Sequence, residues 1–86
     1  MFERGCRVRA LSGRDKGKCF AVIGVKENFA LIADGKERPL QRPKLKSFKH
    51  LELLDRCVPE ESISTNKLLR RELHEDNYTA FGEKKC

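Results

Sequence analysis

Residues 13–18 read Gly-Arg-Asp-Lys-Gly-Lys and place three cations and two glycines in one short segment, here called the basic loop. Glycine adopts positive φ at little steric cost, so the backbone can turn sharply while the basic side chains point outwards. Asp15 is expected to act as an internal counter-charge that holds the turn. Such a loop suits a polyanion. The contacts predicted in the loop are Arg14, Lys16, Gly17 and Lys18.

A second basic tract covers residues 38–49, which read Arg-Pro-Leu-Gln-Arg-Pro-Lys-Leu-Lys-Ser-Phe-Lys. Its two prolines limit the freedom of the backbone, so its cations could follow a phosphate chain at a reduced ordering cost. Lys44 and Lys46 alternate around Leu45, which we expect to point to the core. The alternative is a merely solvated charged face. The contacts predicted in this tract are Arg42, Lys44, Lys46 and Lys49.

Catalytic chemistry has little support in the sequence. The only histidines are His50 and His74, and neither lies in a nucleophile, metal or acid–base motif. Asp34 and Glu37 are expected at turns, where acidic side chains often bond their own backbone. His50 either touches phosphate or forms part of the barrel rim, and His74 is expected on a helix surface. We therefore expect no enzyme, no catalytic residue and no cofactor.

The four cysteines, at positions 6, 19, 57 and 86, are too widely spaced for a Cys-x-x-Cys metal site. We expect reduced thiols and no bound metal. No apolar run approaches the roughly 20 residues that span a bilayer, and the first residues lack the apolar centre of a signal peptide. These features predict a cytoplasmic protein without membrane association.

Positive charge is concentrated in the first part of the chain. The 86 residues carry a formal net charge of +6, with 13 basic and 6 acidic residues in 1–54 and 6 basic and 7 acidic residues in 55–86. A concentrated positive field attracts phosphate polymers or anionic lipid. Sign alone does not choose between these two partners.

Apolar alternation and turn residues predict short strands over 6–10, 19–25, 29–33 and 51–54, with a brief strand around 38–40. Apolar and charged residues alternate over 6–10, as in a strand with one solvent-exposed face. Phe20, Phe29 and Phe48 are expected in the core. Five short strands in so few residues favour a mainly β fold, a small antiparallel barrel of the SH3-like type, because closure removes exposed edges.

The chain changes character after residue 54. We predict a barrel domain over 1–54, then over 55–86 a polar linker at 59–61, a short helix at about 65–75 and a mobile tail from Tyr78. Leu69 and Leu73 share one helical face, and Ile63 precedes the helix as a possible staple. A helix this short is marginal alone and is expected to dock on the barrel or on a partner.

The run from Val8 to Val22, with Gly13, Lys16 and Gly17 in its turn, resembles the KOW motif. Together with the stretch through Leu51, it looks like the bacterial KOW-domain RNA-binding proteins, which are related to the KOW-bearing large-subunit ribosomal proteins of archaea and eukaryotes. The resemblance covers about residues 6–54. It implies an SH3-like barrel that meets ribosomal RNA through its loops, without catalysis or cofactor, and it supports the contacts named above.

These observations predict an RNA-binding module of translation or ribosome assembly, with ribosomal RNA as partner, ribosomal proteins as further candidates, and a monomer when free. The alternative is a protein-interaction module of the SH3-like class that acts in transcription or translation complexes. That alternative needs an exposed aromatic groove, whereas the chain has no Trp and a single Tyr. DNA binding has less support, because no recognition helix is evident.

Overall fold

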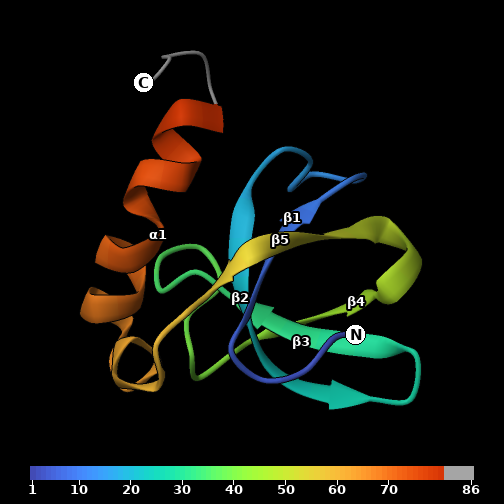
Figure 1. The fold of residues 1–86 in the computed structure, drawn as a ribbon, viewed down its shortest axis with the longest axis horizontal. Helices are drawn as coiled ribbons and strands as arrows, with labels where there is room; N and C mark the ends of the chain where they lie inside the picture. Colours follow the sequence, from blue (N-terminus) through green and yellow to red (C-terminus); the bar gives the residue numbers. More distant parts are fainter. Residues whose placement is uncertain (81–86) are drawn as a thin grey trace.

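Five antiparallel strands form one bent sheet in the spatial order β4-β3-β2-β1-β5, and a helix follows them (Figure 1). This computed structural model describes the backbone of residues 1–80 and the side chains of residues 1–74. The strands are β1 (Cys6–Ala10), β2 (Cys19–Lys26), β3 (Phe29–Ala33), β4 (Lys44–Ser47) and β5 (Leu51–Cys57). Two short 3₁₀ helices, η1 (Phe48–His50) and η2 (Glu60–Ile63), precede β5 and α1 (Asn66–Ala80).

The inner face of the sheet encloses the first core. Val8, Phe20 and Ile32 are fully buried there, because alternate residues of β1, β2 and β3 point to this side. The ring of Phe48 from η1 closes one end by stacking on Phe2, with ring centroids 4.6 Å apart. A register shift between Val22 and Gly24 bends β2 as a β-bulge does, and β5 returns to pair with β1. The result is a small SH3-like barrel, as predicted.

A second core lies on the outer face of the sheet, under α1. Ala21 and Ala33 are opposite each other on β2 and β3, and their small side chains let the helix approach closely. Leu69 and Leu73 pack there and are fully buried, as the predicted helical face requires. The Thr65 hydroxyl accepts a hydrogen bond from the backbone N–H of Leu68 at 3.2 Å and so caps the helix. The helix is therefore docked on the barrel.

Several element boundaries differ from those expected. The strands at 6–10 and 29–33 are confirmed, and β2 is one residue longer than predicted. The strand expected around 38–40 is wrong: that segment is a turn, and the fourth strand is Lys44–Ser47. β5 continues to Cys57, three residues past the end expected at 54. The segment expected to be a polar linker forms η2, whose Ile63 is buried in the second core.

The helix extends to Ala80 rather than ending at about residue 75. Tyr78, where a mobile tail was expected to begin, is thus helical, and the rest of that predicted tail, residues 81–86, lies outside the described residues. In the part of the chain that the structure describes, no helix has the length and apolar character needed to cross a membrane. Cys6, Cys19 and Cys57 form no disulfide, and Cys86 lies outside the described residues.

The facing of β4 is the reverse of the prediction. Leu45 lies opposite Leu31 and is 47% exposed, whereas the neighbouring Lys46 lies opposite Ala30 and is only 8% exposed. A lysine can occupy such a position because its aliphatic stem packs while its ammonium group reaches a polar partner at the edge. Phe20 is buried as expected, but Phe29 is 39% exposed, because it lies at the start of β3 on the outer face.

A further correction concerns Arg7, which was expected on a solvent-exposed face of β1. It is 3% exposed, because α1 covers that face. Its guanidinium group donates to the Glu72 carboxylate at 2.8 Å and to the Cys57 carbonyl at 3.3 Å. This pair of the buried Arg7 with the half-buried Glu72 joins β1 to the helix.

Candidate nucleic-acid interface

The basic loop closes the hairpin between β1 and β2 in a defined conformation. Gly13 has φ +82° and Gly17 has φ +89°, so both glycines use the left-handed region that the sequence anticipated. The Gly17 N–H donates to the Ala10 carbonyl at 2.9 Å, and the Ala10 N–H donates to the Lys18 carbonyl at the same distance. Short bonds inside the loop complete the turn. The backbone of the loop is therefore held by its own hydrogen bonds.

Asp15 forms the floor of the loop. It is 3% exposed, and its Oδ2 accepts hydrogen bonds from Arg38 at 3.0 Å and from Lys44 at 3.4 Å. Burial alone would raise the pKa of Asp15, but the hydrogen bond and charge of Arg38, with those of Lys44, outweigh burial and lower the pKa below its ordinary value. Asp15 is thus ionised and acts as an internal counter-charge, as predicted, but its partners are Arg38 and Lys44 of the second basic tract rather than amides of the loop.

A second ion pair joins the loop to the turn at residues 34–38. The Lys18 ammonium donates to the Glu37 carboxylate at 2.6 Å, and this hydrogen bond, with the charge of Lys18, lowers the pKa of Glu37. The turn itself is held by Asp34, whose Oδ1 accepts from the backbone N–H groups of Lys36 and Arg38 at 2.8 and 2.9 Å. The prediction of a self-bonded turn is confirmed for Asp34, whereas Glu37 bonds to Lys18 instead.

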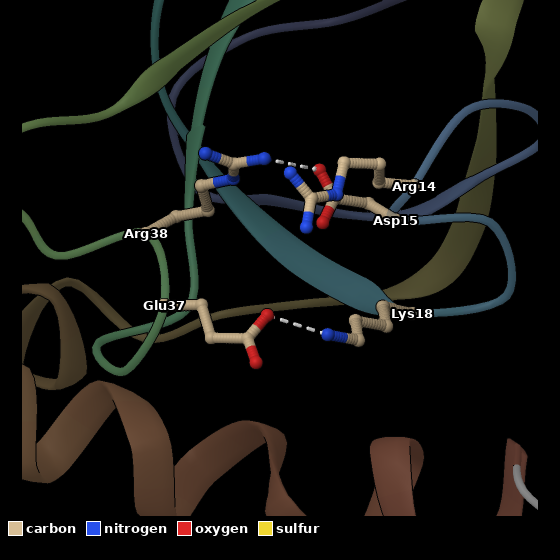
Figure 2. Close-up of a pocket in the computed structure, with 5 residues that line it drawn as sticks. All are labelled: Arg14, Asp15, Lys18, Glu37 and Arg38. Carbon is tan, nitrogen blue, oxygen red and sulfur yellow. Dashed lines mark hydrogen bonds and ion pairs between the residues drawn. The ribbon is translucent and has the colours of Figure 1, made fainter.

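The loop and the turn enclose a polar pocket of about 360 Å³ (Figure 2). The two ion pairs, Arg38 with Asp15 and Lys18 with Glu37, bridge its two sides, and α1 passes beneath them in this view. Three cations face two carboxylates here, so the pocket has an excess of positive charge. The lining residues are Arg14, Asp15, Lys18, Glu37 and Arg38.

The seven charged residues among the predicted contacts fall into two groups. Three lysines are engaged within the protein: Lys18 with Glu37, Lys44 with Asp15, and Lys46, whose buried ammonium group donates to the Ser12 carbonyl at 2.8 Å. Within the described residues, the others form no hydrogen bond or ion pair through their charged groups, and their side chains are exposed. These others are Arg14, Lys16, Arg42 and Lys49.

The exposed cations do not all lie together. Arg14 lines the pocket and Lys16 lies on the same loop. Arg42 lies in the turn before β4, where its backbone N–H donates to the Pro39 carbonyl. Lys49, in η1, lines a different groove beside Phe29 and Phe48. The structure therefore brings together the loop residues, with Lys44 and Lys46 beneath them, and leaves Arg42 and Lys49 outside the pocket.

Arg38 and Glu37 are parts of this surface that the sequence did not single out as contacts. Arg38 opens the second basic tract, so its charge was visible, but its partner Asp15 is 23 positions away and the pairing depends on the fold. Glu37 was expected only to shape a turn. The only sign of its role in the sequence was its position, two residues after the turn signal Asp34-Gly35.

Neither a scan against protein-family models nor a search of the curated proteins finds a match to this chain. The case for a function therefore depends on the charges and contacts described above.

Proposed function

We propose that this chain binds RNA through the basic loop, as a cytoplasmic, non-enzymatic module that acts on ribosomal RNA or on the ribosome. The observation that carries the proposal is that Arg14 and Lys16 are exposed on a loop whose own carboxylate, Asp15, is already paired from beneath by Arg38 and Lys44. Two cations without an acidic partner among the described residues are therefore held outwards by a defined backbone.

The mechanism is electrostatic and depends on shape. Arg14 offers a planar fork of donors to phosphate oxygens, and Lys16 offers a point charge. Folded RNA is recognised largely through phosphate and 2′-hydroxyl contacts, which a rigid loop can make without reading bases. Lys18 can join them when a phosphate replaces the exposed Glu37 carboxylate. The resemblance of residues 8–22 to the KOW motif supports ribosomal RNA as the class of target, with a monomer as the free form.

The test is binding of the full chain to a fluorescently labelled RNA hairpin, followed by anisotropy at about 0.1 M salt. Replacing Arg14 and Lys16 together by alanine is expected to weaken binding on the order of tenfold, because two phosphate contacts are lost. The charge-matched control replaces by alanine two cations away from the loop, the exposed Lys26 and the half-buried Arg9, which pairs with Glu52. Equal losses in both variants would mean that only net charge matters and would reject the loop as the site.

A second candidate function is protein interaction through the groove between η1 and the β2–β3 turn. The observation that favours it is the exposure of Phe29, whose ring lines a groove of about 480 Å³ together with Phe48. Crosslinking of the tagged chain in living cells separates the two candidates. Recovery of ribosomal RNA fragments supports the RNA proposal, and recovery of protein without RNA supports the second candidate.

A further inference from the structure

The exposed side of α1 carries a stripe of basic residues. Lys67, Arg70, Arg71 and His74 are spaced by three, one and three positions, which places them on one helical face. All four are exposed and line one surface hollow of about 360 Å³. Among the described residues, Lys67, Arg70 and Arg71 form no ion pair. The stripe is therefore a strongly cationic surface that is separate from the basic loop.

Helix stability does not explain this arrangement. The first turn of α1 contains no acidic residue, although acids there would favour the helix dipole, and Lys67 places a cation at that end. Cations three and four positions apart repel one another along the stripe. The acidic residue that lies among them in sequence, Glu72, points to the other flank of the helix, where it pairs with the buried Arg7. An external polyanion would relieve this repulsion.

The stripe continues towards the basic loop. Arg70 and His74 share a smaller pocket, of about 150 Å³, with Asp34 and Lys36 of the 34–38 turn. Oδ1 of the buried Asp34 accepts hydrogen bonds from the backbone N–H groups of Lys36 and Arg38, and the side chain of Lys36 is exposed on this side. The other side of the same turn, through Glu37 and Arg38, lines the loop pocket. Figure 2 shows α1 running beside that pocket.

We propose that this face of α1, with Lys36, is a second binding surface for the phosphate backbone of the RNA that the loop binds. The inference rests on the proposed function for the identity of the partner. Its own support is the match between a continuous row of cations and a polymer that carries one charge per nucleotide. An A-form RNA presents phosphates in rows, so one molecule that lies across the 34–38 turn reaches both surfaces.

The test replaces Lys67, Arg70 and Arg71 by glutamine in the full chain, because glutamine removes the charge and keeps a high helix propensity. Binding to the labelled RNA hairpin is expected to weaken on the order of tenfold at about 0.1 M salt. The charge-matched control replaces Arg4, Arg9 and Lys26 by glutamine, and circular dichroism checks that both variants remain folded. A loss no larger than that of the control would overturn the inference.

Amide chemical shifts of the unmodified chain give a readout that needs no variant. Addition of the RNA hairpin is expected to shift the amides of residues 66–73 as well as those of 13–18. Shifts confined to the loop would overturn the inference that α1 binds RNA and would leave the loop proposal intact. Shifts confined to the helix would reject the loop as a binding site and would support α1. Equally tight binding of poly-glutamate to the helix face would assign that face to an acidic protein and would also overturn the inference.

Discussion

At the scale of single residues, Asp15 determines how the basic loop presents its charges. A buried carboxylate is tolerated only when it is paired, and here two cations from distant parts of the chain pair with it. The same contacts occupy Arg38 and Lys44, so Arg14 and Lys16 remain the outward cations. Because Asp15 pairs with Arg38 and Lys44, these two cations have a structural role, whereas Arg14 and Lys16 stay available to a ligand.

Replacing Asp15 by Asn is expected to lower the free energy of unfolding at pH 7 by about 1–3 kcal/mol, because two partly buried cations lose their counter-charge. The pKa of Asp15 is lower in the folded state than its ordinary value near 3.8. Its contribution is therefore complete above that value and declines as the pH falls below it through the folded pKa. Urea unfolding of both proteins between pH 7 and pH 3 measures this.

The difference between wild type and Asp15→Asn should shrink below about pH 4, as the wild-type carboxylate becomes protonated. Glu52→Gln is the matched control, since it removes a carboxylate from an exposed pair with Arg9 and should change stability little. A pH-independent difference for Asp15→Asn would show that its charge does not matter.

The role of Asp15 as counter-charge could be predicted from the sequence, because it is the only acid among the loop cations. Its partners could not be predicted, since a pairing across 23 or 29 positions depends on which strands meet. The engagement of Lys46 was hidden for the same reason. The sequence shows which segment carries the charges, but the packing of the strands determines which of these charges are exposed to solvent.

At the scale of elements, Gly35 joins the 34–38 turn to the helix. It has φ +80°, and a Cβ at this position would overlap the carbonyl oxygen of Asn66 and crowd the backbone nitrogen of Arg70. The Asn66 side chain also accepts a hydrogen bond from the Leu40 N–H at 2.7 Å. The helix therefore docks on the turn through backbone contact, which fixes the stripe of basic residues relative to the loop.

Gly35→Ala is expected to lower the free energy of unfolding by about 2–4 kcal/mol, because backbone strain adds to a clash that must displace α1. Gly17→Ala is the matched control: its φ is +89°, but a Cβ there meets nothing within 4 Å, so strain alone costs about 1–2 kcal/mol. Urea unfolding compares the two. Equal losses would show that the helix does not depend on this contact.

Strand positions could be predicted from alternation in β1 and from a short apolar run between turn residues in β3, and the docking side of α1 followed from Leu69 and Leu73. The position and facing of β4 could not be predicted, because in its sequence Lys-Leu-Lys-Ser the buried residue is a lysine and the most exposed residue is a leucine. A hydrophobic pattern then predicts the wrong facing. The basic stripe on α1 was hidden because charges summed over 55–86 nearly cancel. Within the described side chains, Lys67, Arg70 and Arg71 line one hollow while Glu72 pairs with Arg7.

At the scale of the whole molecule, positive charge lies on two neighbouring surfaces around the 34–38 turn. The net charge of +6 attracts any polyanion, but the arrangement of exposed cations decides how many phosphates can be engaged at once. The loop, the 34–38 turn and the helix together offer six exposed cations. They are Arg14, Lys16, Lys36, Lys67, Arg70 and Arg71.

If about five phosphates are neutralised, log affinity should fall with log salt concentration with a slope of roughly −3.5 to −4.5. The slope reports released counterions and so measures the engaged surface rather than the total charge. Titrations of the RNA hairpin between about 0.05 and 0.3 M salt determine it. A slope near zero with intact binding would contradict the electrostatic mechanism.

Because the turn at residues 34–38 touches the loop pocket on one side and α1 on the other, the spacing between the two cationic surfaces is set by the fold. When an RNA is bound at one surface, the second surface is present at a high effective concentration. Two weak contacts then give tighter binding than either contact alone. A short fragment that reaches only one surface forgoes this avidity. The length of the RNA, more than its base sequence, would then set the residence time.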